Sequence, residues 1–167
     1  NEEVQIDYGK SLDLNLSDAE GATYESSDES VAYITEDGIV FADLVGKATI
    51  KAFSADEKRF AKCEVTVVPT VTMYQEPIMA SRITKTSVKS YEKTFRSLVD
   101  EDATGLLYVG ENSNVDYVMY LFNSTTGYLE SCFVILPTTT SAKTLVNKFL
   151  EQRYIYEGYS EGYNIYS

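Results

Sequence analysis

SSDESVAYITEDGIV, residues 26–40, decides the fold class of the first part of this chain. It opens on Ser26-Ser27-Asp28-Glu29, whose side chains compete for backbone hydrogen bonds and therefore favour a turn. Val31 to Thr35 is rich in residues that favour strands. Asp37-Gly38 is a hairpin signal, because glycine adopts the positive φ that a type I′ turn requires. Ile39 to Ala42 then returns as a second strand.

The alternation of apolar and polar residues continues on both sides of this stretch. Leu12, Leu14 and Leu16 alternate with polar residues, which is the period of a half-buried strand, and a turn is predicted at Asp18-Ala19-Glu20-Gly21. Later apolar residues again recur at every second position: Ala48, Ile50, Ala52, Cys63, Val65 and Val67. Short strands separated by turn signals predict a β-sandwich.

Several short motifs occur in one order along this part of the chain: Gly9, Tyr24, Ser26-Ser27-Asp28-Glu29-Ser30-Val31-Ala32, Gly38-Ile39-Val40, Gly46-Lys47-Ala48-Thr49-Ile50 and Val65-Thr66-Val67. With these motifs the chain resembles the bacterial immunoglobulin-like domains of group 2, which occur in intimin- and invasin-like adhesins and in many bacterial surface proteins. Tyr24 stands where the family usually has tryptophan. The resemblance implies an all-β immunoglobulin-like sandwich and an extracellular or cell-surface location, with the mode of attachment, a lipid anchor included, left open.

Charge and tyrosine content both change near Val68-Pro69-Thr70. Residues 1–69 hold 15 acidic and 6 basic residues, whereas 11 of the 14 tyrosines come after position 70. The two shifts coincide, so we predict a domain boundary there, with an immunoglobulin-like domain at 1–69 and a second domain at 70–167.

The second domain is predicted to be a small α+β domain of no recognised family. Its first helix has an apolar stripe preceded by N-cap oxygens such as that of Thr84, and the stripe consists of Val88, Tyr91, Phe95, Leu98 and Val99. Strands at 106–109, 117–122 and 129–136 precede a second helix with the stripe Ala142, Leu145, Val146, Phe149 and Leu150. A further strand is expected after the second helix, and the order helix, three strands, helix, strand predicts an antiparallel sheet with two helices on one face. Because strand 117–122 is apolar on both sides, its other face is expected to pack on another part of the protein or to be exposed.

Composition argues against several classes of function. The net charge of −12 disfavours nucleic acid and anionic lipid as partners. No apolar run approaches the roughly 20 residues of a membrane-spanning helix. The chain has no histidine, which removes histidine-based triads and most catalytic zinc sites. We therefore expect no enzyme activity, no cofactor and no metal.

Three alternatives remain open from the residues alone. Glu111 and Glu130 are a candidate carboxylate pair for a small hydrolase or a glycan-processing accessory protein. Asp28 and Glu29 are candidate ligands of a cation, although no calcium loop surrounds them. Cys63 and Cys132 are expected to be free thiols, with a disulfide between the domains as the alternative.

The tail RYIYEGYSEGYNIYS, residues 153–167, is the strongest candidate for a binding surface. Tyrosine combines flat apolar area with a hydroxyl group, which suits contacts with sugars or proteins. We predict that Tyr156, Tyr159 and Tyr163 contact a protein or glycan ligand, the alternative being that they cover the sheet or a helix end. The sequence thus favours a non-enzymatic adhesion or binding protein, in which the immunoglobulin-like domain is a spacer.

Overall fold

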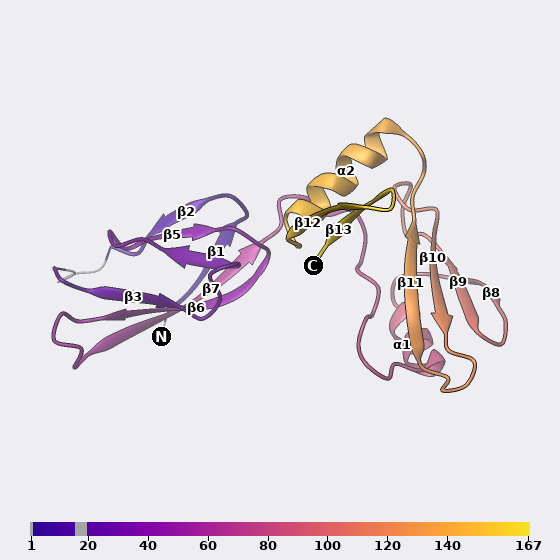
Figure 1. Ribbon diagram of the computed structural model, residues 1–167, viewed down its shortest axis with the longest axis horizontal. Coiled ribbons are helices and arrows are strands. Elements are labelled where there is room, and N and C mark those ends of the chain that lie inside the picture. The colour runs from indigo at the N-terminus through magenta and orange to yellow at the C-terminus, as the bar shows by residue number, and fades with distance from the viewer. Residues whose placement is uncertain (1, 16–19) are drawn as a thin grey trace. The chain divides into compact units, whose positions relative to one another are not determined.

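The computed structural model describes residues 2–15 and 20–167 (Figure 1). Leu16 and the Asp18-Ala19 part of the predicted turn lie outside the described residues. The chain forms two compact units. The first unit consists of Asn1–Thr72 and Asn147–Ser167, and the second unit of Met73–Val146.

Two sheets face each other in the first unit. One has the strand order β1-β7-β6-β3 and the other the order β2-β5-β4. The strands of the first sheet are β1 (Glu2–Asp7), β7 (Phe60–Val68), β6 (Gly46–Phe53) and β3 (Thr23–Ser26). Those of the second are β2 (Ser11–Asp13), β5 (Ile39–Ala42) and β4 (Ala32–Ile34). β1 pairs with β7 in parallel, and the other pairs are antiparallel.

The core of this sandwich comes from the predicted alternation. Its buried residues are Ile6, Val31, Ala32, Val40, Ala42, Ala48, Ile50, Cys63, Val65 and Val67. Residues that point inward from a pleated strand recur at every second position, so one face of each strand is buried and the other remains in contact with water. The predicted all-β sandwich is therefore the architecture of strands β1 to β7.

The corner at Ser26–Ser30 is held by its own side chains. The Ser26 hydroxyl donates to the carbonyl of Ala32 at 2.6 Å and accepts from the Asp28 N–H at 3.2 Å. The Asp28 carboxylate in turn accepts from the N–H of Ser30 at 3.1 Å and from its hydroxyl at 2.6 Å. These contacts replace ladder hydrogen bonds where the chain changes sheets, which is why short polar residues occupy this corner.

The hairpin at Asp37-Gly38 forms, but its turn differs from the predicted type. Gly38 has a φ of 78°, as expected, whereas Asp37 does not have a positive φ. A type I′ turn would need a positive φ at both central residues. Here the Gly38 N–H donates to the carbonyl of Thr35 at 2.9 Å, and the Thr35 N–H donates to that of Ile39 at 3.0 Å. This is the longer hairpin connection in which a turn is followed by a left-handed glycine.

The second unit is an antiparallel sheet with the order β11-β10-β9-β8. Its strands are β8 (Leu98–Glu101), β9 (Gly105–Val109), β10 (Tyr117–Phe122) and β11 (Leu129–Ile135). Helix α1 (Lys85–Glu92) precedes them, with Thr84 as its N-cap. Fully buried Val88 of this helix belongs to one cluster with Leu106, Tyr108, Val115, Val118, Tyr120 and Phe122.

Helix α1 is shorter than the sequence pattern predicts. It ends at Glu92, and Leu98 and Val99 belong to strand β8 at the edge of the sheet. Their spacing fitted the helical period, but the turn around Lys93–Phe95 breaks the helix, as the N–H groups of Phe95 and Arg96 both donate to the carbonyl of Glu92. Strand β8 was therefore not predicted, and the strand expected after the second helix lies in a separate two-stranded sheet.

Helix α2 (Thr140–Glu151) is followed by the strands β12 (Tyr156–Ser160) and β13 (Tyr163–Tyr166). Among the described residues, the buried cluster of the sheet contains Val88 of α1 and no residue of α2. The predicted packing of two helices on one face is thus seen for α1 alone. Residues 147–167 group with the first unit. That residues 1–69 fold independently of residues 70–167 stays a prediction.

Candidate binding surface on the C-terminal hairpin

The tyrosine-rich tail folds into a two-stranded hairpin, β12–β13. Its loop, Glu161-Gly162, has φ values of 52° and 91°, which is the positive pair that a type I′ turn requires. At the open end, Ile155 and Ser167 exchange backbone hydrogen bonds of 2.9 and 3.0 Å. The hairpin is therefore paired from its loop to its open end, with a bulge between Tyr156 and Gly158.

The pairing register divides the predicted tyrosines between the two faces of the hairpin. Tyr156 lies opposite Tyr166, Tyr159 opposite Asn164, and Ser160 opposite Tyr163. Paired residues share a face, and along β13 Asn164 and Tyr166 lie on one face and Tyr163 on the other. A bulge between Tyr156 and Gly158 shifts the register of β12, so Tyr156, Tyr159 and Tyr166 lie on one side and Tyr163 on the other. The rings of Tyr156 and Tyr166 make an edge-to-face contact, 5.4 Å between centroids. The structure thus brings two of the three predicted tyrosines together and adds Tyr166.

All three predicted tyrosines are exposed. The exposed fractions are 53% for Tyr156, 71% for Tyr159 and 70% for Tyr163. The alternative that these rings cover a sheet or a helix end therefore does not describe them. Their role in binding stays a prediction.

The base of the hairpin is anchored within the first unit. The Gln152 side-chain oxygen accepts from the N–H groups of Thr70 at 2.9 Å and Val71 at 3.2 Å, and its amide nitrogen donates to the Thr70 hydroxyl. The Gln152 carbonyl accepts from the Val45 N–H at 2.7 Å. Gln152 is itself buried. These contacts, which have no signature in the sequence, give the exposed hairpin a fixed base.

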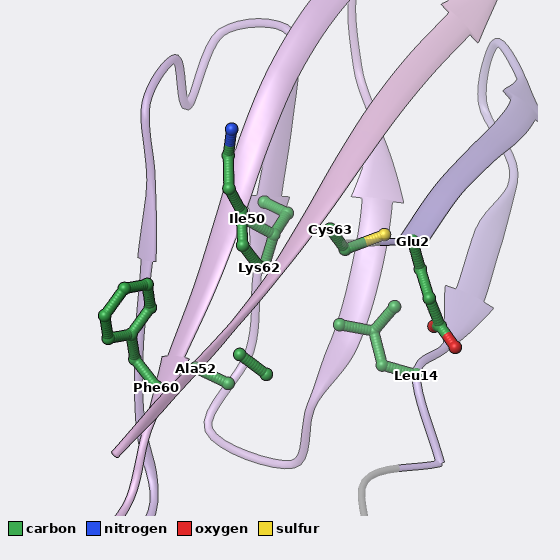
Figure 2. A pocket seen from close by; sticks show the side chains of 8 residues that line it. Glu2, Leu14, Ile50, Ala52, Phe60, Lys62 and Cys63 are labelled. Atoms are coloured by element: carbon green, nitrogen blue, oxygen red, sulfur yellow. The ribbon is translucent and has the colours of Figure 1, made fainter. Parts of the chain in front are cut away.

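A second candidate is a cavity of about 520 Å³ in the first unit, shown in Figure 2. Its walls include Leu14, Ile50, Phe60 and Cys63, and Figure 2 shows the Cys63 sulfur pointing toward Glu2. Burial raises the pKa of the Cys63 thiol, and the negative charges of nearby glutamates raise it further. A protonated thiol is a poor nucleophile, so the cavity offers an apolar wall without an activated group.

Cys63 and Cys132 are both free, as predicted. Burial raises the pKa of the Cys132 thiol to about 12, with a further contribution from the charge of Glu92. Both thiols are therefore protonated at neutral pH and have the properties of small apolar side chains rather than of reactive groups.

The second unit contains a buried charge network that the sequence analysis missed. Arg96 donates through one terminal nitrogen to both oxygens of Glu92, at 2.7 and 2.9 Å, and through Nε to Glu111 at 2.7 Å. Glu92 also accepts from the Tyr120 hydroxyl. Glu92 and Arg96 are buried, and their i, i+4 spacing is the one signal in the sequence that indicated a pair.

This network holds an extended segment against the sheet. The other terminal nitrogen of Arg96 donates to the carbonyl of Gln75, and the Gln75 N–H donates to Glu111 at 2.6 Å. The Asn112 side chain donates to the carbonyl of Met73 at 3.0 Å. Every charge in this network has a partner of opposite sign. The network therefore has a structural role, which is to hold the segment before α1 in place, and no group in it is free to act as a catalytic acid or base.

The candidate carboxylate pair Glu111 and Glu130 is not assembled. Burial disfavours the charge of Glu111, but hydrogen bonds from Arg96 and from the backbone hold its pKa below the usual range. The turn that contains Glu111 lies beside Ile135, since the Asp116 N–H donates to the Ile135 carbonyl. Glu130 lies near the other end of β11, roughly 16 Å away at about 3.3 Å per residue. Paired glycosidase carboxylates lie about 5–10 Å apart.

The candidate cation ligands Asp28 and Glu29 are not gathered into a site. The Ser30 hydroxyl lowers the pKa of Asp28, and this carboxylate is occupied by the corner described above. Within residues 2–15 and 20–167, no cluster of three or more histidine, cysteine or acidic side chains is suited to a metal ion. None of the helices in that part of the chain has the length and apolar character needed to cross a membrane.

One comparison with known proteins, the match to a family model, agrees with the geometry of the first unit. Residues 14–67 match the family model described as bacterial Ig-like domain (group 2), which confirms the resemblance seen in the motifs. A solved structure described as a bacterial Ig-like domain containing GH10 xylanase from termite gut is similar at 17% identity and a TM-score of 0.34. The alignment covers 90% of this chain but 38% of that one. Comparison with curated proteins gave no match.

Proposed function

We propose that this chain, whose residues 14–67 form a bacterial Ig-like domain of group 2, is a non-enzymatic binding module of a secreted or surface-exposed bacterial protein. Domains of this family are typical of extracellular and surface proteins, which supports that location. The sandwich is the spacer of the module, and its exposed hairpin is the contact surface for a protein or glycan at the cell surface.

One observation carries the proposal, namely the exposure of Tyr156, Tyr159 and Tyr163 on a hairpin with a fixed base. Tyrosine has few rotatable bonds, so an exposed ring loses little entropy when a partner covers it. A pyranose ring or an apolar side chain would stack on the Tyr156–Tyr159 face, and the hydroxyl groups would supply hydrogen bonds. Such a contact depends little on charge, so its affinity is expected to vary little with salt.

The test is binding of the full chain to a glycan array and to a display library of extracellular proteins. The triple variant Tyr156→Ala, Tyr159→Ala, Tyr163→Ala should lose the hits that the unchanged chain gives. Each ring is expected to contribute about 1 kcal/mol or more if it is a hot spot. Tyr128→Ala is the matched control, because Tyr128 is an exposed tyrosine outside the hairpin.

Equal binding by the triple variant would contradict the assignment of the hairpin as the contact surface. A screen for glycoside and ester hydrolysis, run on the same preparations, tests the non-enzymatic part of the proposal. Turnover that persists in the triple variant would favour the alternative of a small hydrolase in residues 70–167.

A further inference from the structure

The sheet of the second unit has two apolar faces, and α1 packs on one of them. The register places Met119 between Leu107 and Phe133, and Tyr117 between Val109 and Ile135. These six residues share a face, because directly paired residues point to the same side of a sheet. We call this the outer face. Val118, Tyr120 and Phe122 alternate with its members and lie in the cluster that includes Val88 of α1.

Apart from Asp100 and Ser131, the outer face lacks the polar residues that normally cover the solvent side of an antiparallel sheet. Phe133 is 46% exposed and Tyr117 is 41% exposed, and Val109 and Ile135 are exposed to a similar degree. Strand β10 presents Tyr117, Met119 and Leu121 to this side without a polar residue among them. Soluble proteins seldom leave a continuous apolar patch of this kind without a partner.

The surroundings of this face carry one sign of charge. Between Ser97 and Ala142 the chain has six acidic residues and no lysine or arginine: Asp100, Glu101, Asp102, Glu111, Asp116 and Glu130. Asp100 pairs with Leu107 and so lies on the outer face itself. A shallow groove of about 140 Å³ joins Asp100 and its acidic neighbours to Leu107, Met119 and Leu121.

Three of these acids remain without a cation. Glu101 is paired with Lys85 and Lys89, and Glu111 with Arg96. Within the part of the chain that the structure describes, no ion pair involves Asp100, Asp116 or Glu130. Asp100 lies on the outer face itself, Asp116 precedes Tyr117 at one end of β10, and Glu130 lies at the opposite end of the sheet, near the start of β11.

Helix α1 shows what kind of helix packs on the inner face of this sheet. Its buried Val88 lies between lysines at positions 85 and 89, and both lysines reach the acidic strand β8. Lys85 also lies over the ring of Phe122, 5.8 Å from its centroid. A helix with lysines beside its buried side is therefore complementary to the inner side of this sheet, where Val88 is buried and both lysines meet Glu101.

We propose that the outer face docks a cationic amphipathic helix of a partner protein, with its apolar stripe on Met119 and Phe133 and its basic residues beside Asp100, Asp116 and Glu130. A second copy of this chain fits less well, since two outer faces would bring acidic rims together. The outer face shares no residue with the tyrosine hairpin. Because its proposed contacts include ion pairs, its affinity for a partner should depend on salt, unlike that of the hairpin.

The test uses the full chain and a fluorescent synthetic peptide of leucine and lysine, spaced to form an amphipathic helix. The matched peptide carries glutamate in place of lysine. The lysine peptide should bind, and the glutamate peptide should not. Phe133→Ser, a change at an exposed position, should weaken binding about tenfold or more, because it removes a central apolar contact.

Charge variants separate this site from general attraction to an acidic protein. Asp100→Asn, Asp116→Asn and Glu130→Gln together should lower the affinity about tenfold at low salt and flatten its salt dependence. The control combines Glu29→Gln, Glu36→Gln and Glu57→Gln, which changes the net charge equally on the first unit and should leave binding unchanged. The triple alanine variant of the hairpin should also bind the lysine peptide normally.

Three outcomes would overturn the proposal. One is equal weakening by both sets of charge variants, and another is binding unaffected by Phe133→Ser. The third is dimerisation of the chain without peptide, abolished by Phe133→Ser, which would assign the face to a second copy. Circular dichroism of each variant establishes that it is folded before its affinity is compared.

Discussion

In the first unit, the side chains of Ser26 and Asp28 hold their corner by bonding groups two to six residues away, at the protein surface. In the second unit, Arg96 bonds groups 4, 15 and 21 residues away, in the interior. An exposed local bond exchanges easily with water and contributes little net free energy. A buried charge that loses its partner has no such substitute. The two units should therefore differ in how they respond to the loss of one contact.

The largest effect is expected from Arg96→Met. The change leaves the buried Glu92 carboxylate without its cation and releases the Gln75 carbonyl, so the free energy of unfolding of the second unit should fall by about 3–5 kcal/mol. Urea denaturation followed by tyrosine fluorescence measures this fall. Lys89→Met, which breaks a partly exposed pair with Glu101, is the control and should cost about 1 kcal/mol or less. Similar effects of the two changes would show that the buried network contributes no more than a surface pair.

A smaller effect is expected in the first unit from Gly38→Val. Gly38 has a φ of 78°, and a Cβ added there would lie 3.2 Å from the Tyr24 hydroxyl. A β-branched residue in this backbone region should lower the unfolding free energy by about 1–3 kcal/mol. The melting temperature of the full chain, followed by circular dichroism, reports the change. An unaltered melting temperature would mean that the hairpin can adopt a different turn.

Alkaline pH should destabilise the second unit in particular, because it holds three groups whose pKa values burial raises, Tyr108, Tyr120 and Cys132, against Cys63 in the first unit. Burial raises the pKa of the Tyr108 hydroxyl to about 12, and the charge of Glu92 adds to the shift. The ordinary value is 10.0, so between these values the unfolded state binds fewer protons than the folded state. The stability that the protonated Tyr108 hydroxyl contributes is therefore fully present below pH 10.0 and is lost as the pH rises through its folded pKa of about 12. Cys132 and Tyr120, whose pKa values burial also raises, act in the same direction.

The measurement is the free energy of unfolding of the second unit across the alkaline range. Tyr108→Phe should reduce its slope with pH. The Tyr108 hydroxyl has no hydrogen-bond partner among the described residues, so this change should cost little at neutral pH. A slope identical to that of the unchanged chain would show that Tyr108 does not titrate with unfolding.

The smallest effect is expected from Ser30→Ala at the exposed corner. The loss of the 2.6 Å hydrogen bond to Asp28 should lower the unfolding free energy by about 0.5 kcal/mol. The more specific readout is the pKa of Asp28, which the Ser30 hydroxyl depresses and which should rise in the variant. An Asp28 pKa that stays unchanged in an NMR titration would assign the depression to the backbone N–H groups instead.

The sequence could predict features that depend on contacts between residues close in sequence, and it missed those that depend on contacts between distant residues. The corner at Asp28, the positive φ of Gly38 and the inward position of Cys63 follow from neighbouring residues and strand parity, and each was predicted. The early end of α1 was missed, because Leu98 and Val99 satisfy the helical period although they add a strand to the sheet. The Arg96 network and the Gln152 anchor depend on groups distant in sequence, so no local pattern indicated them beyond the i, i+4 spacing of Glu92 and Arg96. The binding role of the hairpin tyrosines, and with it their exposure, was predicted from the tyrosine-rich tail. Their division between two faces depends on a pairing register that composition does not contain.

The parallel pairing of β1 with β7 has a mechanical consequence. Glu2 lies opposite Cys63 and Asp7 opposite Val68, so the two strands run side by side in one direction. A force that draws the chain before β1 away from the chain after β7 acts along both strands. It loads their ladder in shear, so that the bonds share the tension instead of opening one after another as in a hairpin pulled apart from its ends. Tension applied across the sandwich therefore meets the resistance of the whole ladder at once.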